Sequence, residues 1–487
     1  MPGWSSLVDE ALIAARSIAD YAAGTLNPTL RLGVTGLSRA GKTVFITAMV
    51  QALVEGGRLP VFRAQAEGRV ARASLSPQPD DTVPRFDYET HLADLVGPDR
   101  RWPDSTRQIS ELRLTIEFQS ARRFGSAMST LTLDIVDYPG EWLLDLPLLQ
   151  KSYAEWSAET LAASRAGSRP ALARDWHGHL AGLDPDGPAD ETAARMAAQL
   201  FTAYLRAGRD ERYALSTLPP GRFLMPGDLD GSPALTFAPL DLSPGSDVRP
   251  GSLRAMMERR YEAYKQKVVK PFFVEHFARL DRQVVLVDAL AAFNAGPQAV
   301  RDLETALASV LSAFRVGANS WLSALFRPRV QRILFAATKA DHLHHTSHDR
   351  LEAILRRLAD AAIERAAFAG AAVDVVALAS VRATREATVK QGRESLPCII
   401  GTPVAGERSP TEVFDGTAEI AVFPGELPAD PQAIFSEATF AGLESGVGER
   451  VDYRFIRFRP PLVEPGRVLP HIRLDRALEF LIGDKLA

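Results

Sequence analysis

Residues 36–43, with the sequence GLSRAGKT, combine residue types that are suited to binding phosphate groups. Gly36, Gly41, Lys42 and Thr43 fit the spacing G-x-x-x-x-G-K-S/T. Glycines let the backbone curl so that successive N–H groups point toward phosphate oxygens. In this pattern the lysine reaches the β- and γ-phosphates, and the threonine hydroxyl binds Mg²⁺. The motif therefore predicts that the chain binds a nucleoside triphosphate together with Mg²⁺.

The flanking sequence predicts the strand and the helix that such a loop needs. Residues 32–35 read as a short buried strand, and residues 44–50 read as the helix that follows the loop. The N-terminus of that helix adds a positive dipole end that favours phosphate. A chance match in a glycine-rich turn is the alternative, and this context argues against it. The loop residues expected to contact the nucleotide are Gly36, Ser38, Arg39, Ala40, Gly41, Lys42, Thr43 and Val44.

A second motif, Asp137-Tyr138-Pro139-Gly140, ends a predicted strand at residues 131–136. An aspartate at this position can hold Mg²⁺ through a water molecule, and a glycine N–H can contact a γ-phosphate. An ordinary Pro-Gly turn is the alternative. We therefore predict that Asp137 binds the metal and that Gly140 senses the γ-phosphate.

Two further motifs predict that the base is guanine. Thr338-Lys339-Ala340-Asp341 follows a predicted strand, and a carboxylate there can accept from both N1–H and the exocyclic amino group of guanine. Ala379-Ser380-Val381 follows the next strand, where a backbone N–H can donate to the guanine O6. Each motif is weak alone, but loops at the carboxyl ends of parallel strands converge. The expected base contacts are Lys339, Asp341, His342, Ser380 and Val381.

Alternating strand and helix patterns predict an α/β fold with a mostly parallel sheet. Further strands are expected at 109–118, 130–137, 283–288, 332–337 and 373–378, and helices at 88–95, 300–314 and 348–368. A proline-punctuated loop is expected over 51–102 apart from the helix at 88–95. Short strands at 398–400, 419–423 and 452–458 precede a closing helix at 474–482.

Residues 142–280 read as mostly helical, and they are long enough to form an inserted domain. Helices are expected at 149–166, 170–180, 191–207 and 252–280. Asp190 is a suitable N-cap for the third helix, and Pro271 predicts a kink in the fourth. The predicted parts of the chain are an N-terminal amphipathic helix within 1–28, a nucleotide-binding core over 29–141 and 283–380, the helical insertion over 142–282, and a β-rich extension over 381–487.

The composition narrows the class of protein. The chain has 487 residues, a net charge of −4 and one cysteine, Cys398. This charge gives no support to a nucleic-acid partner, and the single cysteine excludes an internal disulfide. No apolar run approaches the length of a membrane span, and the first residues lack the basic start of a secretory signal. We therefore expect a cytoplasmic protein without a transmembrane segment.

The four motifs together resemble those of Ras-like P-loop GTPases. Longer stretches are similar to the YcjX family of bacterial stress-associated proteins; these stretches are GLSRAGKT, WPDSTRQISELRL, DYPGEW, FLMPGDLDGSPALTFAPL, TKADHLHH and LASVRAT. The resemblance spans nearly the whole chain. It implies binding and hydrolysis of GTP with Mg²⁺, an inserted helical domain, and a role in the envelope or phage-shock stress response. It names no protein partner, and it leaves a peripheral position at the inner membrane open.

The resemblance also assigns roles to residues. It makes Lys42 and Thr43 the phosphate and metal residues, Asp137 and Gly140 the second switch, and Lys339 and Asp341 the readers of the base. Thr106 best matches the first-switch threonine that closes on Mg²⁺, with Ser105 and Thr115 as alternatives. The expected catalytic set is Arg39, Lys42, Thr106, Gly140 and Glu141, and the expected metal ligands are Thr43, Thr106 and Asp137.

Three residues depart from the Ras-like pattern. Glu141 stands where a glutamine often orients the attacking water, so it is turned away, acts as a weak base, or slows turnover. Thr338 replaces the commoner asparagine. Arg39 lies inside the phosphate-binding loop, where it either stabilises phosphate charge in cis or points outward to a surface carboxylate. Arg101 and Arg107 are the alternative cis arginines.

Other patterns carry less specific predictions. His342, His344, His345 and His348 invite a metal interpretation, but a solvated loop beside the base is favoured. Aromatic and basic residues at 453–459 fit an exposed edge strand better than an RNA site. Asp288 ends a strand at the catalytic edge without a strong motif of its own. Two other functions stay open: a nucleotide-sensing switch that holds a partner and barely hydrolyses, and an ATPase or nucleotide kinase.

Overall fold

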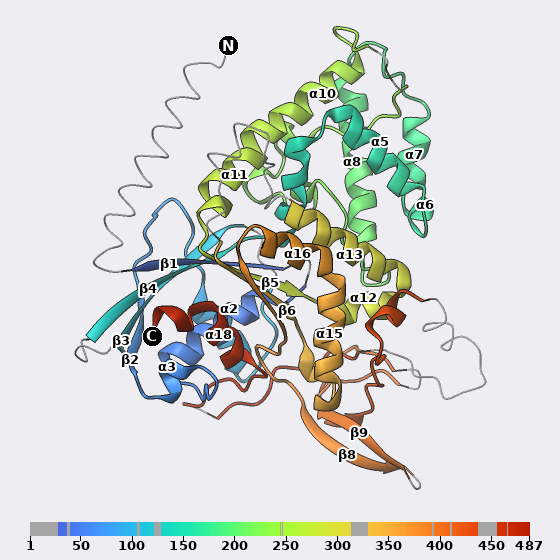
Figure 1. Ribbon diagram of the computed structural model, residues 1–487. Helices are drawn as coiled ribbons and strands as arrows, with labels where there is room; N and C mark the ends of the chain where they lie inside the picture. Colours follow the sequence, from blue (N-terminus) through green and yellow to red (C-terminus); the bar gives the residue numbers. More distant parts are fainter. Residues whose placement is uncertain are drawn as a thin grey trace.

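The fold is built on a central twisted sheet, seen in a computed structural model (Figure 1). The structure describes residues 28–36, 39–104, 108–120, 128–243, 245, 247–312, 330–391, 394–409, 412–436, 455–464 and 466–487. The described residues form a seven-stranded sheet in the order β2-β3-β4-β1-β5-β6-β7. The strands are β1 (Thr29–Gly36), β2 (Val70–Ser76), β3 (Ser110–Gln119), β4 (Met128–Asp137), β5 (Arg282–Val287), β6 (Arg332–Ala337) and β7 (Ala372–Ala377).

Five of these strands run parallel, which confirms the predicted α/β class. β4, β1, β5, β6 and β7 are parallel neighbours, whereas β3 is antiparallel to both β2 and β4. β1, β5 and β6 are almost continuously buried, because helices cover both faces of a parallel sheet. β2, with the sequence VARASLS, lies at the sheet edge and was not predicted, because its polar side chains face solvent.

Two apolar cores lie on the two faces of the sheet. One core contains α2 (Lys42–Val54) and the closing helix α18 (Leu474–Ile482), whose predicted bounds are confirmed. The other core contains α12 (Ala289–Ala295), α13 (Pro297–Ser312), α15 (His348–Leu358) and α16 (Asp360–Phe368). α15 and α16 were predicted as one helix, but Ala359, with φ −97° and ψ 6°, separates them.

The chain between β4 and β5 is helical and is called the helical segment here (teal through green to yellow-green in Figure 1). It contains the 3-10 helix η1 (Gly140–Gln150) and the helices α5 (Tyr153–Ser164), α6 (Arg169–Leu172), α7 (Arg174–Leu180), α8 (Glu191–Gly208), α9 (Gly221–Leu224), α10 (Leu253–Tyr264) and α11 (Lys270–Glu275). Its aromatic core, with Trp156 stacked on Tyr261 at 5.0 Å, is continuous with one face of the sheet. The segment therefore packs on the sheet through a shared core.

Local signals in this segment behave as the sequence predicts. Asp190 caps α8 by accepting from the N–H groups of Thr192 and Ala193. One π-helical turn, η4 (Lys265–Val269), interrupts the last long helix directly before Pro271. Proline lacks the N–H that an α-helix needs, so the predicted irregularity occurs there.

The C-terminal part forms a second, smaller sheet with the order β10-β9-β8. Its strands are β8 (Arg385–Gln391), β9 (Glu394–Gly401) and β10 (Ile420–Val422). The strand predicted at 452–458 is wrong in its described part, where Phe458 makes an isolated bridge to Pro403. The N–H and guanidinium of Arg457 bind Glu407, so they do not join a ladder. The predicted N-terminal amphipathic helix lies outside the described residues.

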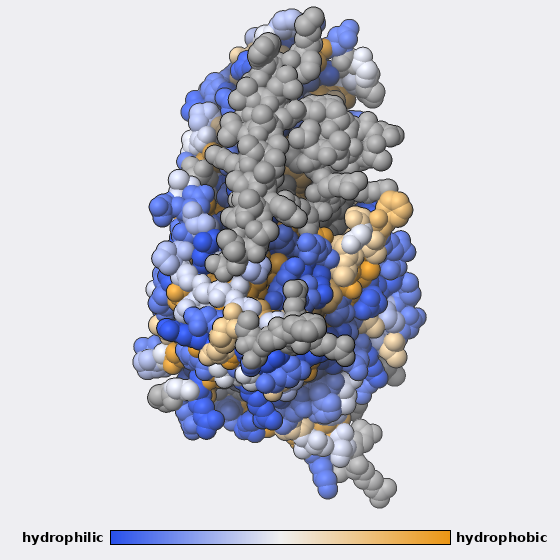
Figure 2. Space-filling model, turned by 60° about the vertical axis from the view of Figure 1, so that its left-hand side comes forward, coloured by the Kyte–Doolittle hydropathy of each residue, from blue (hydrophilic) through white to orange (hydrophobic). Residues whose placement is uncertain are grey.

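Most of the described surface on the face shown in Figure 2 is hydrophilic, with smaller hydrophobic patches. Among the helices that the structure describes, none is long and apolar enough to cross a membrane.

Candidate nucleotide-binding site

The phosphate-binding loop connects β1 to α2, as predicted. Gly41 has φ 83° and Arg39 has φ 59°, so the loop turns through the left-handed region twice. Glycine adopts this conformation without strain, whereas arginine does so at a cost that is common at functional sites. The buried Lys42 side chain folds back, and its Nζ donates to the carbonyl oxygen of Gly36 at 3.1 Å. Ala40 and Val44 lie in this turn and helix, whereas Ser38 lies outside the described residues.

The second motif packs directly on the phosphate-binding loop. Asp137 ends β4 and pairs in register with Val34 of the adjacent β1. A Cβ atom on Gly140 would lie 2.0 Å from the carbonyl oxygen of Gly36, so only glycine fits this approach. Asp137 and Thr43 are both buried at this edge. A carboxylate and a hydroxyl are oxygen donors of the kind that Mg²⁺ prefers, so these two residues fit the metal.

The predicted base motif at residues 338–341 is held by hydrogen bonds from the loop that follows β7. Asp341 is buried, and its Oδ2 accepts from the N–H of Ala383 at 2.9 Å. The Thr384 hydroxyl donates to the carbonyl oxygen of Asp341 at 2.5 Å. Ser380 and Val381 are buried in the same loop after β7. The structure therefore brings the two predicted base motifs together.

Lys339 and Asp288 form an ion pair at the same edge. Lys339 has φ 60°, and its Nζ lies 2.5 Å from Asp288 Oδ2. The other oxygen of Asp288 accepts from the N–H of Ala291 and caps α12. Asp288 is thus a site residue that sequence reasoning undervalued; its place directly after a buried strand was the available signal.

His342 lies beside these residues, and burial holds the pKa of its imidazole below the usual range. Its ring meets the ring of Phe458 edge-on, with centroids 5.7 Å apart. The His342 side chain is therefore uncharged at neutral pH, and it lines the cavity described next.

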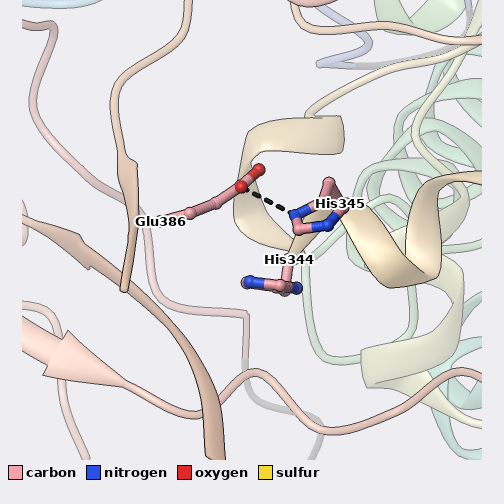
Figure 3. Close-up of side chains that lie close together, drawn as sticks. All are labelled: His344, His345 and Glu386. Atoms are coloured by element: carbon pink, nitrogen blue, oxygen red, sulfur yellow. Dashed lines mark hydrogen bonds and ion pairs between the residues drawn. The ribbon is translucent and has the colours of Figure 1, made fainter. Parts of the chain in front are cut away.

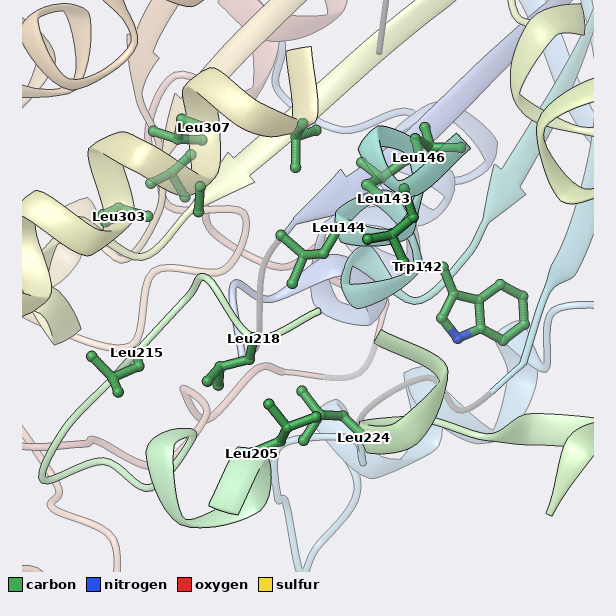
Figure 4. Close-up of a cluster of buried hydrophobic side chains, with 14 of the residues drawn as sticks. Trp142, Leu143, Leu144, Leu146, Leu205, Leu215, Leu218, Leu224, Leu303 and Leu307 are labelled. Carbon is green, nitrogen blue, oxygen red and sulfur yellow. The ribbon is translucent and has the colours of Figure 1, made fainter. Parts of the chain in front are cut away.

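A cavity of about 440 Å³ adjoins these parts of the site. Single residues from the phosphate-binding loop and from the position directly after the second motif line it, together with residues of the base edge and of the turn after α8; among them are Arg39, Glu141, Arg209, Glu211, Asp288, Lys339 and His342. Lys42, Thr43, Asp137 and Asp341 are not among its lining residues. Figure 4 shows buried leucines of η1, α8, α9, α13 and the chain between α8 and α9; Leu144, Leu215, Leu218 and Leu224 among them also line the cavity. Charged residues from both the sheet edge and the helical segment therefore line the cavity, together with apolar side chains from both sides.

A family model described as the YcjX-like family, DUF463, matches residues 30–486. The chain belongs to the YcjX-like family. Two relatives carry the name Ras-like GTPase YcjX. The Escherichia coli protein is 41% identical over 472 residues, which cover 94% of this chain and 96% of the relative. The Shewanella oneidensis protein is 35% identical over 489 residues, which cover 95% and 96%.

In this YcjX-like chain, the two unusual charges of the site, Glu141 and Arg39, both pair with residues directly after α8. The carboxylate of Glu141 is 5% exposed, and its Oε1 lies 2.7 Å from Arg209 Nη2. Arg39 points outward and pairs with Glu211, as in the outward alternative. Sequence reasoning missed Arg209 and Glu211, because they are distant in the chain and belong to no motif.

The other first-switch and arginine candidates fall elsewhere. Thr115 lies in the middle of β3 and bonds the Ser76 hydroxyl at 2.7 Å, away from the carboxyl edge of β4. Arg101 is exposed and pairs with Asp94 at 2.7 Å. Ser105, Thr106 and Arg107 lie outside the described residues, so Thr106 stays a prediction.

The histidine cluster separates into different environments. His348 is buried and bonds the carbonyl oxygen of Ala340. His344, His345 and Glu386 place ligand atoms within 4.8 Å of one another, and His345 Nδ1 lies 2.7 Å from Glu386 Oε2 (Figure 3). Arg382 lies 3.5 Å from the other carboxylate oxygen and already compensates its charge. This arrangement fits a surface ion-pair network as well as a metal site.

Proposed function

We propose that this chain binds GTP with Mg²⁺, hydrolyses it to GDP and phosphate, and acts as a nucleotide-dependent switch. The observation that carries this proposal is the placement of the phosphate, metal and base motifs at or directly after the ends of strands β1, β4, β6 and β7 of one sheet, where the carboxyl ends of parallel strands meet. The names of the two relatives point to the same nucleotide.

The phosphates are assigned to Lys42, to the N–H groups of the loop and to the N-terminus of α2. Thr43 and Asp137 are the proposed protein ligands of Mg²⁺, with Thr106 as the first-switch ligand. When bound, the metal supplies positive charge that offsets the charge of the β- and γ-phosphates. Gly140 packs closely against the backbone of Gly36, and its N–H group is proposed to contact the γ-phosphate.

The reaction proposed is in-line attack of water on the γ-phosphorus. The water oxygen forms a bond to phosphorus as the bond to the β–γ bridging oxygen breaks, and the water proton leaves with the phosphate product. Negative charge develops on the bridging oxygen of GDP, which Lys42 and the loop amides stabilise. The switch loops order around the γ-phosphate and relax after its loss.

Guanine recognition is assigned to the carboxylate of Asp341, with the Lys339 stem against the base and the loop at Ser380 and Val381 near O6. The hydrogen bond from the N–H of Ala383 fixes the orientation of the Asp341 carboxylate. A carboxylate held in one orientation is suited to recognising one base. A site that pairs with polar groups of one base rejects a base that leaves them unpaired.

The proposed division of the chain follows the sequence. It comprises a GTPase core over 29–141 and 283–380, a helical insertion over 142–282 and a C-terminal extension over 381–487. A stress-response role, a protein partner and a cytoplasmic or peripheral membrane location are carried only by the family resemblance, and they stay predictions.

The test is titration calorimetry of GDP, ADP and xanthosine diphosphate with Mg²⁺ on the wild type and Asp341→Asn. We expect GDP to bind at least about 100-fold tighter than ADP. The variant should lose that preference and bind xanthosine diphosphate. Asp360→Asn, at an exposed position in α16, removes the same charge elsewhere and should change nothing.

Equal binding of ADP and GDP, or an unchanged preference in Asp341→Asn, would overturn the guanine assignment. Multiple-turnover phosphate release from GTP tests hydrolysis separately. Absence of turnover with intact GDP binding would leave the partner-holding switch as the function.

A further inference from the structure

The turn after α8 contacts the nucleotide site at two charged points. Arg209 caps the end of α8, and its guanidinium meets Glu141 directly after the second motif. Two residues later, Glu211 meets Arg39 of the phosphate-binding loop. The side chain of Asp210 accepts from the N–H of Arg212 at 3.0 Å and orders the turn. The positive and negative side chains of this turn, Arg209 and Glu211, therefore pair with a negative and a positive side chain of the site, Glu141 and Arg39.

Glu141 is a problem for hydrolysis unless its charge is compensated. A carboxylate repels the negative charge of a triphosphate, and burial makes an unpaired carboxylate still more unfavourable. Its backbone has little freedom to turn away, because Gly140 packs on Gly36 and a Cβ on Gly221 would lie 1.9 Å from the carbonyl oxygen of Glu141. The carboxylate must therefore be neutralised where it stands.

Arg209 is the residue in position to do this. Its side chain is 22% exposed and its guanidinium reaches Glu141 from the wall of the cavity. Nearby arginines have other contacts: the guanidinium of Arg222 lies 3.2 Å from the centre of the Trp142 ring, and Arg457 pairs with Glu407. A carboxylate paired on one oxygen keeps acceptor capacity for a water molecule.

We propose that Arg209 is a positioning residue for GTP hydrolysis. It removes the net charge of Glu141 and fixes the carboxylate, so that Glu141 orients the attacking water in the place where Ras-like proteins use an uncharged glutamine. This inference rests on the proposed function. It makes the helical segment a working part of the hydrolytic site.

The experiment measures the rate of single-turnover phosphate release from GTP, and it measures GDP affinity by calorimetry. The variants are Arg209→Ala, Arg209→Gln, Glu141→Gln and the double variant Arg209→Ala with Glu141→Gln. Arg206→Ala is the matched control, because Arg206 is an exposed arginine in the last turn of the same helix. Arg209→Gln keeps a polar side chain, so it serves if the alanine variant is unstable.

We expect Arg209→Ala and Arg209→Gln to lower the single-turnover rate about 10- to 100-fold, in the range of a lost proton-transfer or water-orienting group. GDP affinity should change less than about threefold. With Glu141→Gln already present, removing Arg209 should cost less than about threefold, since no charge is left to neutralise.

A rate in Arg209→Ala equal to that of the Arg206→Ala control would overturn the inference. It would also be overturned if Arg209→Ala lowered the rate by the same factor in the wild type and in Glu141→Gln. If the wild type binds GDP but shows no turnover, the inference falls while guanine binding stands. If the wild type binds neither GDP nor GTP, the proposed function itself falls with it.

Discussion

Replacing Gly140 by alanine tests whether close packing of the second motif on the phosphate-binding loop sets nucleotide affinity. The added Cβ would lie 2.0 Å from the carbonyl oxygen and 2.6 Å from the carbonyl carbon of Gly36. Relief of this overlap requires the two backbones to separate by about 1 Å, and such overpacking costs about 1–3 kcal/mol.

The same displacement reaches the phosphate-binding lysine. The Gly36 oxygen accepts from Lys42 Nζ at 3.1 Å, and a shift of about 1 Å takes that contact beyond hydrogen-bonding distance. A loss of about 1.4 kcal/mol is tenfold in affinity, so the dissociation constant of GDP should rise about 10- to 100-fold. Titration calorimetry measures the affinity, and thermal unfolding measures the accompanying loss of stability.

Gly178→Ala is the matched control, because no atom lies within 4 Å of its added Cβ and the residue is exposed on α7. Alanine is also the better helix former, so this variant should be at least as stable as the wild type. A Gly140→Ala protein with wild-type GDP affinity and melting temperature would refute the packing argument.

Three further variants test charged groups. Arg39→Ala should change stability by less than about 0.5 kcal/mol in denaturant unfolding and turnover by less than about threefold, because the exposed fractions of Arg39 and its partner Glu211 are 56% and 58%. Burial raises the pKa of Asp145 to about 6 from 3.8, so its contribution to stability is present below pH 3.8 and lost as the pH rises through 6. The free energy of unfolding of Asp145→Asn, relative to that of the wild type, should therefore be about 1–3 kcal/mol higher at pH 7.5 than at pH 4.5. Denaturant unfolding of both proteins at the two pH values measures this difference. Asp302→Ala should cost about 3–5 kcal/mol by chemical unfolding, because it leaves the buried Arg169 without its carboxylate; a cost below about 1 kcal/mol would contradict this.

Sequence patterns were most reliable where one local rule decides the structure. β6 at Arg332–Ala337 and α18 at Leu474–Ile482 have the predicted bounds, because each shows an uninterrupted apolar pattern. They were least reliable at exposed edges. β8, with the sequence REATVKQ, has few apolar residues and gains its ladder from β9, so its own residues gave little signal.

The individual binding motifs can be recognised from the sequence alone. Gly36, Gly41, Lys42 and Thr43 fix a local turn and its donors, and the carboxylate of Asp341 supplies the acceptors for the proposed contact with the base. These signals are readable because the residues of each motif are near neighbours in the chain, and the positions that need glycine allow no other residue.

Only the tertiary structure decided what surrounds the motifs. The contact of Glu141 with Arg209, of Arg39 with Glu211, and of Lys339 with Asp288 joins residues that are distant in the chain. No periodicity specifies such pairs, because an ion pair requires only that two side chains meet, and the packing of the helical segment on the sheet determines which ones do. The sequence thus determined which groups can bind a nucleotide, and the fold decided which charges face it.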